Sequence, residues 1–169
     1  MVGVLVIICG LPGVGKTTFA KKLAPLINAV VLSTDQIRKE LIEFPTYEKD
    51  ERKLIYDVMI LLAKYLHNSG INCILDATFN KEYSRMEVKS KLKIQDCNFF
   101  VIECLCPENV VIPRLTNRRD DFSDAGIEIY QKMKKIYEPV KIKHITIDTS
   151  SDSESNAKFV SSKILNSKR

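Results

Sequence analysis

The segment GLPGVGKT at positions 10–17 has the residue types and the spacing that hold phosphate groups. It fills every fixed position of the pattern GxxxxGK[ST] and contains three of the six glycines of the chain. Glycine permits positive φ and lets backbone amides approach phosphate oxygens, and a helix N-terminus adds a favourable dipole. An apolar run precedes the segment and an amphipathic run follows it, as the motif requires. The expected nucleotide-binding residues here are Gly10, Leu11, Pro12, Gly13, Val14, Gly15, Lys16, Thr17 and Thr18.

The end of this segment and a later aspartate predict a site for Mg²⁺ and ATP. Lys16 can reach the β- and γ-phosphates, and the hydroxyl of Thr17 can ligate Mg²⁺. Asp76 ends an apolar run and is expected to reach the metal directly or through water. The simpler interpretation of the segment is a glycine turn that only joins a strand to a helix.

Asp35 and Arg38 follow a second apolar run and lie three residues apart, on one helical turn. A carboxylate can take the proton of an acceptor hydroxyl, and a guanidinium can hold an anionic group in bidentate fashion. Since neither His67 nor His144 is near in sequence, we predict that Asp35 is the general base and that Arg38 contacts the acceptor. The alternative is that Asp35 only caps a helix and that Arg38 is exposed.

Arginines recur in the segment RLTNRR at positions 114–119. Arg114 and Arg118 lie four residues apart on one helical face, beside a charged loop. A lid over residues 114–124 would cover the transferring phosphoryl group and exclude water. We therefore expect Arg118 to act in catalysis and Arg114 to bind nucleotide. Which of Arg114, Arg118 and Arg119 contacts the transferred phosphate stays open. The alternative is an exposed basic helix end.

A basic row with a spacing of four residues follows Asp76: Lys81, Arg85, Lys89 and Lys93. Such a row can guide a polyanion to a pocket, and Arg85 is expected to contact the acceptor. The alternative is a solvated helix face.

Two absences narrow the class of nucleotide-binding protein. GTPase switches carry the base-recognition element NKxD, and Asn80-Lys81-Glu82-Tyr83 lacks its aspartate. Many ATPases end a strand with Asp-Glu, whose Glu activates water, whereas Asp76-Ala77-Thr78 ends the strand here. An acceptor hydroxyl is therefore the expected nucleophile.

Apolar runs alternate with amphipathic runs along the chain, which is typical of a parallel sheet covered by helices on both faces. The expected strands are 3–9, 29–33, 71–75, 98–105 and 143–148. The expected helices are 16–27, 35–42, 51–68, 83–94, 107–117, 125–137 and 152–166. Pro113 should kink the helix that contains it, and Asp124 is the expected N-cap of the next helix. We interpret residues 1–169 as a single domain.

The composition is that of an ordinary globular protein, with 45% hydrophobic and 28% charged residues. No apolar run is long enough for a membrane helix, and we expect a cytoplasmic protein. The net charge is +5, and the whole excess lies in residues 131–169. The five cysteines form no CxxC pair, which favours packed thiols over a metal or redox site.

The sequence resembles the small P-loop kinases related to phage polynucleotide kinase, the zeta toxins and archaeal seryl-tRNA(Sec) kinase. The segments that carry the resemblance are GLPGVGKTT at 10–18, STDQIRKEL at 33–41, LDATF at 75–79 and RLTNRR at 114–119. The resemblance implies an α/β P-loop kinase fold of three layers, with a five-stranded parallel sheet in the order 2-3-1-4-5. It also implies that adenine lies between the lid and the loop at 148–151.

These observations predict an ATP- and Mg²⁺-dependent kinase that phosphorylates a hydroxyl. The acceptor is expected to be a nucleic acid 5′-hydroxyl or a nucleotide-like alcohol. One alternative is a small metabolite such as a sugar, nucleoside or antibiotic. Another is a regulatory NTPase or ATP-binding module without kinase activity. The sequence leaves the oligomeric state open.

Overall fold

The computed structural model describes residues 2–117 and 126–167 of the chain. Five parallel strands form one sheet in the order β2-β3-β1-β4-β5, which confirms the predicted three-layer P-loop kinase fold and its strand order. The strands are β1 (Leu5–Cys9), β2 (Ala29–Ser33), β3 (Asn72–Asp76), β4 (Phe99–Leu105) and β5 (Ile145–Asp148).

The central strand β1 is buried on both faces because its residues alternate between two cores. Val6 and Ile8 belong to the core on one face of the sheet, and Leu5 and Ile7 belong to the core on the other. All five residues of β1 are fully enclosed. An uninterrupted apolar run is therefore the expected sequence of this strand.

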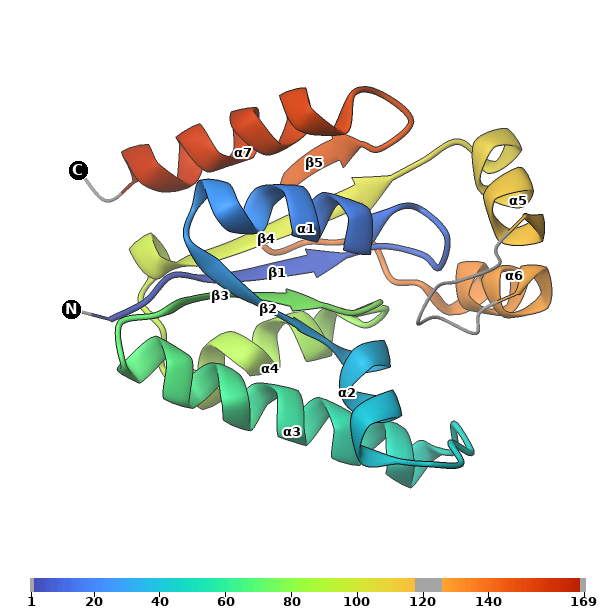
Figure 1. Cartoon of the computed structure of the whole chain (residues 1–169), viewed down its shortest axis with the longest axis horizontal. Coiled ribbons are helices and arrows are strands. Elements are labelled where there is room, and N and C mark those ends of the chain that lie inside the picture. Colours follow the sequence, from blue (N-terminus) through green and yellow to red (C-terminus); the bar gives the residue numbers. More distant parts are fainter. Residues whose placement is uncertain (1, 118–125, 168–169) are drawn as a thin grey trace.

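Helices cover both faces of the sheet, as Figure 1 shows. Helices α1 and α7 pack together over one face, and α3 and α4 lie over the other. Helices α2, α5 and α6 lie toward the end of the molecule to which the strand arrows point. The helices are α1 (Lys16–Leu26), α2 (Thr34–Leu41), α3 (Lys49–Asn68), α4 (Glu82–Leu92), α5 (Glu108–Thr116), α6 (Ile127–Ile136) and α7 (Ser153–Asn166).

The register of the sheet places three loops at one edge. Asp76, the last residue of β3, is paired with Ile8 of β1 and with Ser33 of β2. The phosphate-loop segment leaves β1 at this level, and α2 begins directly after Ser33. The carboxyl ends of parallel strands share one edge, so residues far apart in sequence meet there.

The element bounds lie within two residues of the sequence predictions. A short 3-10 helix at Asp96–Asn98 precedes β4, and β5 begins at Ile145 rather than at 143. Helix α5 includes Pro113 and continues to Thr116, and the amide of Asn117 donates to the carbonyl of Pro113 at 3.0 Å. The predicted N-cap Asp124 lies outside the described residues.

Among the described residues, no helix is both long enough and apolar enough to cross a membrane.

Candidate functional site

The phosphate-loop segment turns tightly between β1 and α1, and two glycines make the turn feasible. Gly10 has φ of +144°, and a Cβ there would lie 2.5 Å from the carbonyl oxygen of Cys104. Gly13 has φ of +79°, and a Cβ there would lie 2.7 Å from a methyl group of Leu115. Helix α1 begins at Lys16 without a side-chain cap, so its first amides remain available to an anion.

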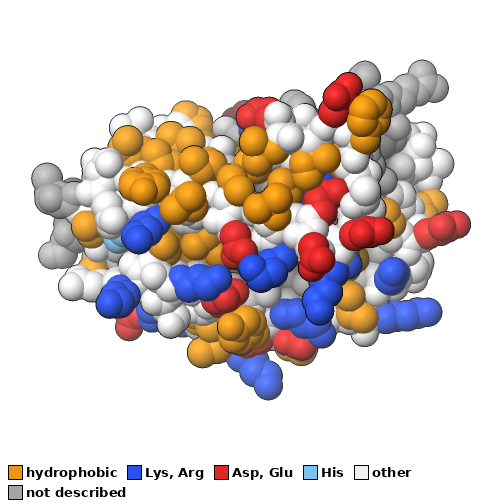
Figure 2. Space-filling model, turned by 90° about the horizontal axis from the view of Figure 1, so that it is seen from below, with side chains coloured by type: hydrophobic (Ala, Val, Ile, Leu, Met, Phe, Trp, Pro, Cys, Tyr) orange, Lys and Arg blue, Asp and Glu red, His pale blue; other side chains and the backbone are white. Residues whose placement is uncertain are grey.

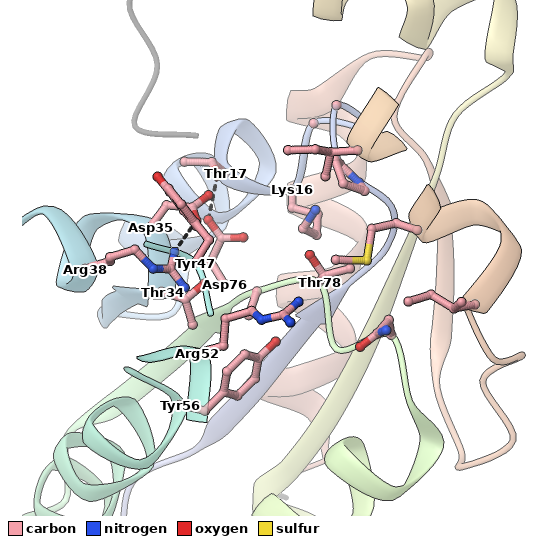
Figure 3. A pocket seen from close by; sticks show the side chains of 18 of the residues that line it. Lys16, Thr17, Thr34, Asp35, Arg38, Tyr47, Arg52, Tyr56, Asp76 and Thr78 are labelled. Carbon is pink, nitrogen blue, oxygen red and sulfur yellow. Dashed lines mark hydrogen bonds and ion pairs between the residues drawn. The ribbon is translucent and has the colours of Figure 1, made fainter. Parts of the chain in front are cut away.

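A cavity of about 350 Å³ opens in front of this loop, and it gathers residues from several elements. The side chains from the loop and from the ends of β2 and β3 are mostly polar, whereas those from α6 are apolar (Figure 3). The lining side chains used below belong to Lys16, Thr17, Asp35, Arg38, Tyr47, Arg52, Tyr56, Asp76, Thr78, Asn80, Ile129, Met133 and Ile136.

Lys16 lies at the wall of the cavity formed by the loop. Its Nζ donates to the carbonyl oxygen of Leu11 at 2.9 Å, so the side chain folds back over the loop. In Figure 3 the ammonium group faces the centre of the cavity, where phosphate oxygens approaching the loop would meet it. This position agrees with the role predicted for Lys16.

Thr17 and Asp76 meet at the base of the cavity. The hydroxyl of Thr17 donates to Oδ2 of Asp76 at 2.6 Å, and Asp76 is 3% exposed. Both side chains offer an oxygen atom that can ligate a metal ion. A Mg²⁺ site in a nucleotide complex commonly takes one or two protein oxygens besides phosphates and water. No group of three or more metal-ligating side chains occurs in the described residues. The pair therefore fits Mg²⁺ held jointly with a nucleotide.

Asp35 lies in the first turn of α2, on the side of the cavity away from the loop. Its Oδ1 accepts a hydrogen bond from Arg38 at 3.1 Å, and its side chain is 39% exposed. The structure thus brings Asp35 to the same cavity as Lys16, as the sequence predicted.

Arg38 lines this cavity but is held by other residues. Its Nε donates to Oε1 of Glu51 at 2.9 Å, and the ring of Tyr47 covers the guanidinium at 4.8 Å. Only 6% of its side chain is exposed, so the alternative of an exposed Arg38 is wrong. Sequence reasoning missed Glu51, because nothing in the spacing of 13 residues indicates this contact.

Arg52 and Tyr56 also reach the cavity, and sequence reasoning missed both. They lie one helical turn apart on α3 and point toward the cavity in Figure 3. The hydroxyl of Tyr56 accepts from the amide of Phe79 at 3.3 Å, and burial raises the pKa of Tyr56 to about 12. The polar face of the predicted helix was the available signal, but polar faces are common on surface helices.

The apolar wall comes from α6, whose Ile129, Met133 and Ile136 line the cavity. Ile129 and Ile136 are each 42% exposed, which leaves apolar surface open toward the site. Their spacing of four and three residues was visible in the sequence, where it suggested only an amphipathic helix.

Arg114 lies next to the phosphate loop, on the far side from Asp35. It donates to the carbonyl oxygen of Thr149 at 3.1 Å and to Sγ of Cys106 at 3.4 Å. A Cβ on Gly15 would lie 3.5 Å from its guanidinium, so Arg114 borders the loop as predicted for a nucleotide-binding residue. Arg118, Arg119 and most of the predicted lid fall outside the described residues.

Arg85 requires a correction, because the structure does not bring it to the cavity. Its side chain is fully buried and donates to the carbonyl oxygens of Phe79, Glu138 and Pro139 and to the carboxylate of Glu82. A guanidinium with this many donated bonds has a structural role and cannot reach an acceptor without leaving several oxygens unpaired.

The predicted basic row on α4 does not form a continuous positive face. Lys81 pairs with Glu138 and Lys89 pairs with Asp96, while Lys93 ends the helix in a left-handed conformation. Figure 2 shows acidic and basic side chains interspersed over part of the face that α3 and α4 present, beside a hydrophobic patch. This arrangement favours the solvated-face interpretation over a docking track for a polyanion.

A model of the protein family described as AAA domain matches residues 5–140 of this chain. The chain is similar to the L-seryl-tRNA(Sec) kinase of Methanococcus maripaludis, with 30% identity over 134 residues. That match covers 76% of this chain and 51% of the kinase. An uncharacterised protein of Mycobacterium tuberculosis is 28% identical over 139 residues, which cover 74% of this chain and 28% of that protein. The chain therefore spans about half or less of these relatives.

Among solved structures, the fold is similar to that of the APS kinase CysC of Mycobacterium tuberculosis in complex with AMPPNP and APS. The TM-score is 0.74 with 18% sequence identity, and the match covers 98% of each chain. At this identity the likeness concerns the fold.

Proposed function

Since this chain belongs to the family of P-loop kinase-like proteins described as AAA domain, we propose that it transfers the γ-phosphoryl group of ATP to an acceptor hydroxyl. The observation that carries this proposal is the meeting of Lys16, Thr17 and Asp35 around one cavity. A phosphate loop alone occurs in motors, switches and kinases. A carboxylate across the cavity from that loop is the further group that a kinase needs for its acceptor.

On the nucleotide side, the loop amides and Lys16 bind the phosphates, and Arg114 lies where it can contact the nucleotide beside Thr149. Thr17 and Asp76 supply the protein oxygens for Mg²⁺. Mg²⁺ held there would offset the negative charge of the phosphates. Lys16 adds a positive charge that stays close to the phosphates as the bond to the leaving group breaks.

On the acceptor side, Asp35 accepts the proton of the hydroxyl as the oxygen attacks the γ-phosphorus. One P–O bond forms to the acceptor oxygen, and the bond between the γ-phosphorus and the β,γ-bridging oxygen breaks, releasing ADP. Holding the two substrates in line and stabilising the phosphate charge supply most of the rate in such a reaction. The apolar wall of α6 limits the water that can compete with the acceptor.

The acceptor proposed here is a nucleotide-like alcohol or a nucleic acid 5′-hydroxyl, and a small metabolite is the alternative. The similarity to a relative named as a tRNA kinase supports the first class. The interspersed charges on the face of α3 and α4 support the second, because that face offers no extended track for a polyanion.

The test is a transfer assay with ATP labelled at the γ-phosphate over RNA and DNA 5′-hydroxyl ends, nucleosides, sugars and amino alcohols. We expect label in one acceptor class and none with Lys16→Ala, whose folding is checked by circular dichroism. Fast release of labelled phosphate without any acceptor would contradict the kinase assignment and favour a regulatory NTPase.

A further inference from the structure

Two arginines reach the acceptor side of the cavity, and they differ in what already binds them. Arg38 donates Nε to Glu51 and one terminal nitrogen to Asp35, and its flat face lies under Tyr47. A guanidinium has five N–H donors in a fixed plane, so these bonds fix its orientation. An acceptor anion would have to compete with two carboxylates for Arg38.

Glu51 is itself held firmly, so it keeps Arg38 in place. Its Oε2 accepts from the amide of Thr46 at 2.5 Å, from the hydroxyl of Thr46 at 2.9 Å and from the amide of Tyr47 at 3.2 Å. Burial acts to raise the pKa of Glu51, but the bonds from Thr46, Tyr47 and Arg38 together lower the pKa below its ordinary value. Glu51 is therefore ionised at neutral pH, and its side chain is only 9% exposed.

The contacts of Glu51 also fix the loop between α2 and α3. Tyr47 has φ of +59°, a left-handed conformation that is uncommon for a bulky residue. Its amide is one of the donors to Glu51, and its ring covers Arg38. The loop, Glu51, Arg38 and Asp35 are thus joined by hydrogen bonds, and Arg38 is the residue that contacts Asp35.

Arg52 is the next residue after Glu51, but its surroundings differ from those of Arg38. It lines the cavity and is exposed, and within residues 2–117 and 126–167 its side chain makes no ion pair or hydrogen bond. Figure 3 shows it pointing from α3 into the cavity, near Tyr56 and toward Thr78. The apolar residues of α6 line the same cavity.

We propose that Arg52 binds an anionic group of the acceptor. Glu51 instead holds Arg38 in the orientation that positions Asp35. This inference rests on the proposed kinase function and narrows its substrate. The acceptor would be an alcohol that carries a phosphate, sulfate or carboxylate, with an apolar or planar part against Ile129 and Met133. A planar guanidinium binds such groups through two parallel hydrogen bonds.

The first experiment measures anion binding without turnover. Sulfate is titrated into the protein saturated with AMPPNP and Mg²⁺, which occupies the phosphate loop, and the arginine Nε–H signals are followed by NMR. We expect sulfate to shift the Arg52 signal and leave the Arg38 signal in place. Loss of a charged hydrogen-bonding partner in Arg52→Gln should weaken sulfate binding by roughly 10–100-fold. Lys53→Gln is the matched control, since Lys53 lies next to Arg52 but pairs with Asp57.

The second experiment compares alcohols that differ only in an anionic group. The pairs are glycerol with glycerol 3-phosphate and adenosine with adenosine 3′-phosphate, and an oligonucleotide with a 5′-hydroxyl tests whether the anion belongs to a strand. We expect the charged member to have the lower KM. Arg52→Gln should remove that advantage, and Lys53→Gln should keep it.

The outcomes separate this inference from the proposed function. Sulfate binding that depends on Arg52, without transfer to any alcohol, would support the anion site and contradict the kinase assignment. Transfer with a charge preference that survives Arg52→Gln would support the kinase and overturn the anion site. Sulfate binding that is lost in Arg38→Gln but kept in Arg52→Gln would show that the two roles are reversed.

Discussion

The hydroxyl of Thr17 donates a 2.6 Å hydrogen bond to Oδ2 of Asp76, although the two residues lie 59 positions apart. Thr17 lies in the first turn of α1, and Asp76 ends the neighbouring strand β3. The bond joins the start of α1 to β3, the strand between β1 and β2 in the sheet. Two of the oxygen atoms proposed for Mg²⁺ are therefore in place together.

Replacing either member of this pair should weaken the response to Mg²⁺. In Asp76→Asn the ligand loses its charge, so we expect a higher Mg²⁺ requirement together with weaker ATP binding. Thr17→Val keeps the shape of the side chain and should act in the same direction. The measurement is ATP affinity by calorimetry across a Mg²⁺ series. An unchanged Mg²⁺ dependence in both variants would contradict the metal assignment.

Asp35→Asn should affect the chemical step instead. The amide keeps the size of the side chain but cannot accept the proton, so kcat should fall by roughly 10²–10⁴-fold. ATP affinity should stay close to that of the parent protein, because Asp35 lies on the side of the cavity away from the phosphate loop. Steady-state kinetics and an ATP titration test both parts. If ATP binding were the main property lost, Asp35 would not be the base.

Glu51→Gln should lower kcat through Asp35, and a double-mutant cycle can show this. We expect a loss of about 10-fold in the parent background and almost none in the Asp35→Asn background, as for residues that act as a unit. A role in loop stability alone would give equal losses in both backgrounds. Glu40→Gln is the control, because Glu40 is on the neighbouring helix and contacts only the exposed Gln36 among the described side chains.

Arg85 should matter for stability and not for substrate recognition. Arg85→Met leaves the carboxylate of Glu82 and three carbonyl oxygens without their buried donor. Removing one partner of a buried ion pair typically costs about 3–5 kcal/mol of unfolding free energy. Urea unfolding measures this loss, and the acceptor KM of the protein that remains folded should be unchanged. A raised KM with intact stability would instead support the sequence-based acceptor role.

Acidification should destabilise the fold through the same carboxylates. For Glu82, burial raises the pKa, but bonds from Arg85, Lys141 and Ile142 lower the pKa below the ordinary 4.5, and the pKa of Glu51 is also lowered. The stabilisation that these two ionised carboxylates contribute is complete above the ordinary pKa of 4.5. It is lost as the pH falls through their lower folded-state pKa values. Unfolding free energies measured from about pH 6 to about pH 3 should decline, and the decline should be shallower in Glu51→Gln.

The phosphate loop was predictable from the sequence, because its requirements are local. Gly10 and Gly13 supply backbone conformations and space that a Cβ would block, and the strand and helix on either side follow directly in the chain. The positions of Asp35 and Asp76 were also predictable, since polar residues follow each buried strand and the carboxyl ends of parallel strands share one edge. The strand order followed from the resemblance to small P-loop kinases.

The surroundings of each arginine, in contrast, could be known only from the folded structure. Arg38, Arg52 and Arg85 have the same chemistry, yet their surroundings differ. Arg38 is bound to Asp35 and Glu51, and Arg85 is enclosed among carbonyl oxygens. Arg52 points into the cavity and makes no hydrogen bond or ion pair through its side chain in the described part of the chain. Sequence spacing predicted acceptor contacts for Arg38 and Arg85 and passed over Arg52. A long charged side chain takes its role from burial and from partners on other elements, and those partners meet it only when the chain is folded.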